Sequence, residues 1–271
     1  MDINVQNFAV ANLRRRPVVV EIGGFVAGLD PETTSPYINY ATPLPGAEPT
    51  GRDVAALLAA FRKRGLKPRL EFAPDAAPAV EPALRAAGFT TEETHEYLVC
   101  TPDTLRVKNA NPGRSDTAPD GSPQSDDAPR RIAQIVETPA TDEDYASLDA
   151  ALSEAFGGQF ASSAHGAARL RRVQENGGAV RFVRAPDGSC AGGASCSPPA
   201  VGTCELSGVG TRPRLRGRGI AAAVTAALTG AMFAQGAASV WLEYSGEGSR
   251  RVYQQVGYQP RGTRLYMSLE E

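Results

Sequence analysis

Residues 209–221 read VGTRPRLRGRGIA, in which positions 212–219 crowd four arginines and two glycines between a strand-like run and an alanine-rich run. Gly217 and Gly219 have no Cβ atom, so the backbone there can bend and approach a ligand closely. The first N–H groups of the helix that follows are unpaired and lie at its positive dipole end. Such a loop, with arginines beside it, predicts a binding site for a phosphorylated ligand.

Two known phosphate-binding motifs compete for this loop. The run from Gly217 to Ala222 fits the dinucleotide fingerprint G-x-G-x-x-A, and Glu243 ends the next strand-like run. Only 28 residues follow Glu243, too few to complete a doubly wound sheet, and the fingerprint does not require the arginines. A P-loop is excluded because no Gly-Lys-Ser/Thr sequence follows. Binding of NAD is therefore only a minor alternative.

The loop and the segments after it resemble a known family. Residues 214–219 resemble the Arg/Gln-x-x-Gly-x-Gly/Ala motif of the GNAT superfamily of acyl-CoA N-acyltransferases. Residues 240–244 stand where the family's fifth strand lies, and residues 251–258 resemble its short fourth helix. The motifs occur in the family's order, and the resemblance covers roughly residues 130–271.

The resemblance implies an α/β (α+β) fold, with a mixed, mostly antiparallel twisted sheet flanked by helices. It also implies acetyl-CoA as the acyl donor, held where the fourth and fifth strands splay apart. In the family, the fourth strand pairs with the pantetheine, and amides of the loop hold the pyrophosphate. Ser245 falls near a position where many relatives carry an asparagine that contacts CoA, which is a departure from the pattern. Donor binding is thereby assigned to Val209, Gly210, Thr211, Arg214, Leu215, Arg216, Gly217, Arg218, Gly219, Ile220 and Ser245.

The resemblance also suggests catalytic residues. Tyr253 is the candidate general acid, because a phenol near the sulfur can protonate the departing CoA thiolate. Glu205, at the start of the expected fourth strand, is the candidate base for the incoming ammonium, directly or through water, and Glu243 is a weaker alternative. We expect the acceptor pocket between the first two helices and the last hairpin of this half. Its candidate lining residues are Phe156, Phe160, His165 and Tyr266.

The chain divides into two similar halves. Positions 106–131 hold no Leu, Ile, Met or aromatic residue, so we predict a flexible linker at 106–130 between domains 1–105 and 131–271. Both halves end in an expected strand, helix, strand and strand, and eight positions separate Phe89 from Tyr97 and Tyr258 from Tyr266. The chain thus resembles a tandem GNAT protein. Its first copy is predicted to be degenerate, because residues 43–51 contain three prolines and an acid but no Arg-x-x-Gly-x-Gly motif.

Composition narrows the class of protein. A net charge of −2 gives no reason to expect a nucleic-acid or membrane partner. No 18-residue apolar run and no signal-like start are present, so we expect a cytoplasmic protein. The four cysteines lack C-x-x-C spacing and the chain has two histidines, so we expect reduced, packed thiols and no metal site. The Ala- and Gly-rich helix at 221–238 would permit a homodimer without requiring one.

The leading hypothesis is an acetyl-CoA-dependent N-acetyltransferase that acts on a small-molecule amine or an exposed protein amino group. The alternative, from another class, is a non-catalytic acyl-CoA-binding protein with a regulatory or interaction role. A thiol-pathway amine is a further candidate acceptor, since a tandem arrangement is also found in mycothiol synthase. That idea rests on architecture alone, and architecture does not fix function.

Overall fold

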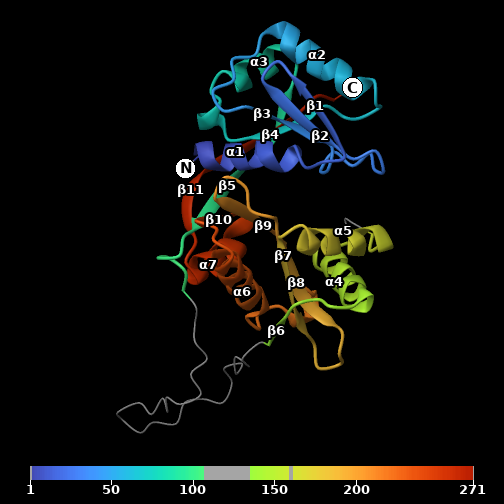
Figure 1. The fold of residues 1–271 in the computed structure, drawn as a ribbon, viewed down its shortest axis with the longest axis vertical. Helices are drawn as coiled ribbons and strands as arrows, with labels where there is room; N and C mark the ends of the chain where they lie inside the picture. The colour runs from blue at the N-terminus through green and yellow to red at the C-terminus, as the bar shows by residue number, and fades with distance from the viewer. Residues whose placement is uncertain (1, 107–134, 159–160, 271) are drawn as a thin grey trace.

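The computed structural model describes residues 2–106, 135–158 and 161–270 (Figure 1). The predicted linker, apart from Arg106, lies outside these residues. The N-terminal half contains α1 (Asp2–Leu13), β1 (Val18–Ile22), β2 (Phe25–Leu29), β3 (Tyr40–Pro43), α2 (Gly51–Arg62), β4 (Arg69–Phe72), α3 (Val80–Ala86) and β5 (Thr90–Cys100). The C-terminal half contains β6 (Val136–Glu137), α4 (Asp142–Ala155), α5 (Ala164–Glu175), β7 (Ala179–Arg184), β8 (Cys190–Cys196), β9 (Thr203–Thr211), α6 (Ile220–Ala234), β10 (Ser239–Glu243), α7 (Gly246–Val256) and β11 (Gln259–Ser268).

The two halves repeat one order of elements, which is three strands, a helix, a strand, a helix and a strand. This order runs from β1 to β5 and again from β7 to β11. The predicted final pair of strands is wrong in both halves, because a single long strand follows the last helix in each. No turn interrupts residues 90–100, whose residues from 94 onward alternate between the two faces of the sheet, so the segment remains one strand.

All strands join one 11-stranded sheet in the order β1-β2-β3-β4-β11-β5-β10-β9-β8-β7-β6. The last strands of the two halves are exchanged within it. β11 pairs antiparallel with β4, with Leu265 opposite Phe72, while β5 pairs antiparallel with β10, with Leu98 opposite Leu242. β5 and β11 also pair with each other. Each half therefore completes its sheet with the final strand of the other, and the mixed α/β fold class is confirmed.

Helices cover both faces of this sheet (Figure 1). On β5, Leu98 and Cys100 pack in the core under α6, whereas Tyr97 and Val99 pack with α1 on the opposite face. Leu265 and Met267 of β11 pack under α2 and α3. Leu265 lies opposite Thr94 of β5, and Thr94 points to the same side of the sheet as Leu98. Since Leu265 packs under α2 and α3 and Leu98 packs under α6, these three helices cover the same face of the sheet.

α1 lies on the other face. So does α4, because Leu148 of α4 packs with Val180 and Phe182 of β7, whereas the alternate residues Ala179 and Val183 pack under α6. Both α1 and α4 contact β9.

The core under α6 follows the helical spacing of its apolar residues. Ile220, Val224, Leu228 and Met232 are buried at this spacing, and Thr225 and Thr229 are buried beside them. The Thr229 hydroxyl donates to the Thr225 carbonyl at 2.7 Å and lies 2.6 Å from the Tyr258 hydroxyl, which satisfies both of these hydroxyls. The Thr225 hydroxyl itself has no hydrogen-bond partner among the described residues. All four cysteines are buried and unpaired. Among the described residues, no helix has the length and apolar character needed to cross a membrane.

Candidate active site

A gap opens between two parallel strands in the C-terminal half. β9 and β10 pair at three positions, the last of which joins Glu205 to Trp241. Beyond that pair, β9 continues to Thr211 alongside β8 alone. A bulge interrupts this second half of β9, where Gly208 has a φ of +66°, a value that favours glycine. The stretch that holds Val209, Gly210 and Thr211 therefore has no strand partner on its β10 side among the described residues.

The arginine–glycine loop leads from this gap to the start of α6. Gly217 and Gly219 adopt φ values of +76° and +84°, in the left-handed region that glycine enters most readily. Gly219 is the N-cap of α6, and no side chain caps this 15-residue helix. The loop is exposed from Arg216 to Gly219, so the positive end of the helix faces solvent. This geometry suits a phosphate group.

The four arginines of the loop do not play the same role. The Arg212 guanidinium donates to the Cys190 carbonyl at 2.7 Å and pairs with Glu154 on α4. The Arg216 guanidinium donates to the Ala155 carbonyl at 2.8 Å. Two arginines therefore attach the loop to α4 and β8, which the sequence did not predict. Arg214 and Arg218 are exposed on the loop.

The corresponding region of the N-terminal half is closed by its own side chains. The side chain of Gln6, fully buried on α1, donates to Thr42 Oγ1 at 2.7 Å and to the Pro43 carbonyl at 2.6 Å, and accepts from the Ala73 N–H at 2.9 Å. It thereby bridges the end of β3 to the residue after β4. At the start of α2, Thr50 and Asp53 form a reciprocal capping box. A side-chain carboxylate therefore occupies the start of α2, whereas the equivalent helix start in the C-terminal half, that of α6, has no side-chain cap.

Tyr253 lies on α7, on the face of the sheet that α6 covers. Its side chain is buried in the core beneath α6, and its ring centroid lies 6.2 Å from that of Tyr258. Its hydroxyl has no hydrogen-bond partner within the described part of the chain. Desolvation raises the pKa of Tyr253 to about 12, so the phenol keeps its proton at neutral pH. Ser245 is the exposed N-cap residue of α7, and its carbonyl accepts a 2.7 Å hydrogen bond from Ser249.

Glu205 points to the opposite face of the sheet. Its neighbours Cys204 and Leu206 enter the core under α6, so the alternation of the strand directs Glu205 toward α1. The side chain is partly exposed. Desolvation raises the pKa of Glu205 to about 7, with further increases from Glu243 and Glu71 and opposing effects from Arg264 and Arg16. Glu71 and Arg16 belong to the N-terminal half, a contribution that the sequence did not reveal.

The alternative base, Glu243, and the predicted pocket residues are spread over this region. The carboxylate of Glu243 is occupied, because it accepts from Arg264 at 2.9 Å and from the Tyr266 hydroxyl. Phe156 is 37% exposed at the end of α4. His165 Nδ1 lies 3.5 Å from Glu32 Oε2 of the N-terminal half. Phe160 lies outside the described residues.

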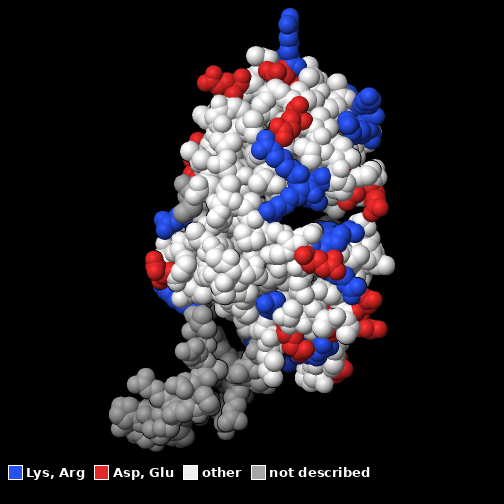
Figure 2. All heavy atoms as spheres, viewed as in Figure 1, with Lys and Arg blue, Asp and Glu red and all other residues white. Residues whose placement is uncertain are grey.

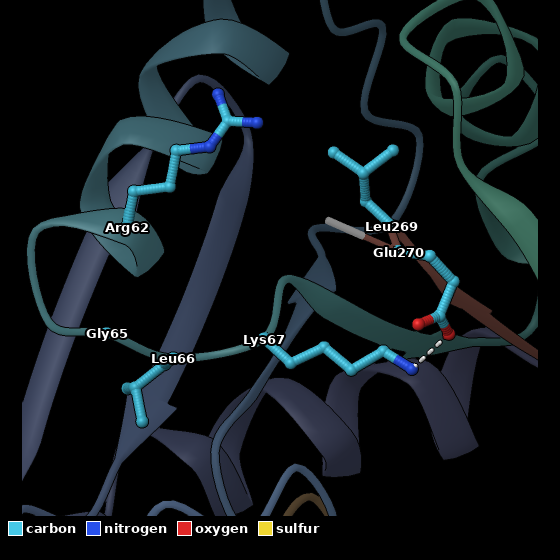
Figure 3. Close-up of a pocket in the computed structure, with 6 residues that line it drawn as sticks. All are labelled: Arg62, Gly65, Leu66, Lys67, Leu269 and Glu270. Atoms are coloured by element: carbon cyan, nitrogen blue, oxygen red, sulfur yellow. Dashed lines mark hydrogen bonds and ion pairs between the residues drawn. The ribbon is translucent and has the colours of Figure 1, made fainter.

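A separate surface pocket lies near the C-terminus of the chain, at the end of α2 (Figure 3). Lys67 reaches Glu270 across it, with 2.6 Å between Nζ and Oε1. None of the predicted donor-binding or catalytic residues lines it. Its walls are formed by Arg62, Gly65, Leu66, Lys67, Leu269 and Glu270.

Residues 146–258 match the model of the acetyltransferase (GNAT) family. This part of the chain belongs to the GNAT family. The matched segment contains the gap, the loop, Glu205 and Tyr253, whereas the N-terminal half lies outside it. The sequence of the chain matches no curated protein.

Solved structures extend the likeness over the whole chain at the level of fold. A GCN5-related N-acetyltransferase from Kribbella flavida has a TM-score of 0.76 and 22% identity, covering 100% of this chain and 96% of its own. A tandem GNAT protein from the clavulanic acid biosynthesis pathway has a TM-score of 0.59 and 14% identity, covering 92% and 79%. A GCN5-related N-acetyltransferase from Sphaerobacter thermophilus has a TM-score of 0.57 and 15% identity, covering 90% and 76%. At these identities the likeness concerns the fold, which is that of a tandem GNAT structure.

Proposed function

We propose that this protein transfers the acetyl group of acetyl-CoA to a primary amine of a small molecule or an exposed amino group. The observation that carries this proposal is the gap between β9 and β10, which continues into the uncapped start of α6. An elongated ligand that ends in phosphates fits a strand edge followed by a helix N-terminus. The GNAT family match of the same segment supports the assignment.

The residues present fit the donor. Backbone groups of Val209, Gly210 and Thr211 would pair with the pantetheine, and the N–H groups from Gly217 to Ile220 would hold the pyrophosphate. Arg214 and Arg218 would add charge at the loop surface, while Arg216 would act mainly by anchoring the loop to α4. The donor supplies an acetyl group activated as a thioester.

Glu205 and Tyr253 divide the proton transfers between them. Glu205 removes one proton from the acceptor ammonium, which frees the lone pair that forms the new C–N bond. As the C–S bond breaks, Tyr253 donates its proton to the sulfur. The remaining excess proton on the nitrogen returns to Tyr253 through water, and the proton on Glu205 leaves to solvent. The products are the acetylated amine, CoA and one proton.

The N-terminal half has a different role in this scheme. Gln6 and the Thr50–Asp53 cap close its equivalent of the donor site, so one chain would bind one molecule of acetyl-CoA. Its contribution would be structural, through the exchanged strand β5, and electrostatic, through Glu71 and Arg16 near Glu205.

The test combines binding with turnover. Isothermal titration of the purified chain with acetyl-CoA, CoA and NAD should show binding of both CoA species and none of NAD. Thiol release from acetyl-CoA in the presence of a panel of amines should then exceed release without an amine. Tight binding of acetyl-CoA with no transfer to any amine would favour a regulatory acyl-CoA-binding protein instead. Absence of binding to either CoA species would overturn the proposal.

A further inference from the structure

An opening separates the two halves on the face of the sheet that carries α1 (Figure 2). In that view Lys or Arg side chains lie above and below it, and Figure 1 places α1 above and α5 below the same position. The contacts between the halves on this face include two polar ones. Arg15 donates to the carbonyls of Pro198 and Pro199 at 2.9 and 2.7 Å, and His165 lies 3.5 Å from Glu32. Segments from both halves therefore border the opening.

Glu205 lies on the same face, on a strand that both α1 and α4 contact. It is partly exposed, so solvent reaches its side chain. Arg16, which follows α1, lies near enough to favour its charged form and so to lower its pKa. The candidate base and an arginine of the N-terminal half therefore face a shared space.

The arginines near the C-terminal end of α1 and on α5 fall into two groups. Arg14 pairs with Glu21 at 2.8 Å, and Arg171 pairs with Asp142. Three arginines differ, because they have no hydrogen-bond or ion-pair partner anywhere in residues 2–106, 135–158 or 161–270. These three are Arg16 of the N-terminal half and Arg169 and Arg172 of α5.

The unpaired arginines approach each other from opposite halves. Desolvation lowers the pKa of Arg169, Asp149 opposes this shift, and the charges of Arg16 and Arg172 lower the pKa further. Arg169 is nevertheless exposed, as expected of a side chain in a concave surface that solvent still enters. The acid whose charge acts on Arg169, Asp149, already accepts hydrogen bonds from the Ser162 hydroxyl and the Ser163 N–H at 2.9 Å. The like charges of Arg16 and Arg172 therefore disfavour the charged form of Arg169.

We propose that Arg16 and Arg169 bind a carboxylate or phosphate group of the acceptor and direct its amine toward Glu205. Guanidinium groups suit either anion, because their fork of donors matches carboxylate and phosphate oxygens. The acceptor would then be an anionic amine, and the N-terminal half would supply half of its anchor. The role of the amine rests on the proposed acetyltransferase function, whereas the anion site itself does not.

The anion site is tested first, without acetyl-CoA. All variants carry Gly217→Glu, so that the arginine–glycine loop cannot bind the probe. Inorganic phosphate and acetate are titrated separately, and the arginine Nε–H signals are followed by NMR. We expect at least one anion to bind with a Kd in the millimolar range, and Arg16→Gln with Arg169→Gln to weaken it by about tenfold or more, which is the loss of one charged hydrogen bond.

Controls separate binding from folding. Arg52→Gln removes an exposed arginine on the opposite face of the sheet and should leave the Kd unchanged. Arg16→Lys keeps a charge and should retain part of the anion affinity. If a variant loses affinity because it no longer folds correctly, its circular dichroism spectrum should change as well. If neither anion binds the parent protein, or if the double variant binds both as the parent does, the inference is wrong.

The acceptor class is tested next in the protein with an intact loop. Matched amines are compared, glucosamine 6-phosphate with glucosamine for phosphate, and L-phenylalanine with phenethylamine for carboxylate. We expect kcat/KM to be about tenfold or more higher for the anionic member of one pair, and the two glutamine variants to abolish that preference mainly through KM. Equal rates for both members of each pair would refute an anionic acceptor. Failure to bind acetyl-CoA would refute only the acetyltransferase assignment, since the anion titration does not depend on it.

Discussion

The Arg264 guanidinium on β11 donates a 2.9 Å hydrogen bond to Glu243 on β10, although these strands are not neighbours in the sheet. β5 of the N-terminal half runs between them. The same guanidinium lies 3.5 Å from Glu71 Oε2 on β4. Its side chain is only 3% exposed. One buried cation therefore balances a carboxylate from each half at the point where the halves exchange strands.

Replacing Arg264 should destabilise both halves together. Arg264→Met would leave Glu243 buried without a cation, whereas Glu71 would keep its ion pair with Arg69. Breaking the buried pair should cost about 3–5 kcal/mol in the free energy of unfolding. Urea unfolding, followed by circular dichroism and by the fluorescence of Trp241, would measure it. Both signals should change in one transition, because β5 and β11 belong to both halves. Arg261→Met, at an exposed position on the same strand, should change stability by less than about 0.5 kcal/mol. A similar small effect of Arg264→Met would contradict this interpretation.

Donor binding should depend on one loop only. Gly217→Glu places a carboxylate and a side chain at a position with positive φ, where phosphate is expected, so acetyl-CoA affinity should fall by about 100-fold or more. Gly46→Glu is the matched control, since Gly46 has a φ of +69° in the loop before α2. It should bind acetyl-CoA as the parent does. Calorimetry should give one donor per chain, and a stoichiometry of two would show that the N-terminal half also binds it.

Tyr253 should affect turnover rather than donor binding. Tyr253→Phe removes the proton donor but keeps the buried ring, so we expect kcat to fall by about 100-fold with an unchanged Kd for acetyl-CoA. Tyr258→Phe removes the hydroxyl that contacts Thr229 and should cost about 1 kcal/mol of stability without a comparable loss of kcat. Equal kcat values for Tyr253→Phe and the parent would remove Tyr253 from the mechanism.

The sequence predicted the parts of this structure that local chemistry determines. A strand beginning near Glu205 was expected, and the structure places it at Thr203–Thr211, between Gly202 before it and Pro213 after it. Gly217 and Gly219 were singled out because only a few residues tolerate the conformations that a tight loop requires, and both adopt positive φ. The helix that carries Tyr253 was expected because residues 251–258 resemble the short fourth helix of the GNAT superfamily, and the structure has α7 at Gly246–Val256.

Long-range pairing was not predictable in the same way. The exchange of β5 and β11 is decided by which strands meet in three dimensions, and alternation within Thr90–Cys100 does not name a partner. The helix Asp2–Leu13 was missed, although it supplies Gln6, which closes the N-terminal gap. The pKa of Glu205 likewise depends on Glu71 and Arg16, which lie far away in the sequence.

The pH dependence of turnover should report Glu205. A base must be deprotonated to act, and a pKa of about 7 means that Glu205 is mostly protonated below that pH. We therefore expect kcat/KM for acetyl-CoA, at a saturating amine concentration, to fall about tenfold per pH unit below pH 7 and to level off above it. Glu205→Gln should lower the plateau by about 100-fold or more and remove the step near pH 7. Glu81→Gln, at an ion-paired surface carboxylate on α3, should leave both unchanged. A step that persists in Glu205→Gln would mean that another group, or water, removes the proton.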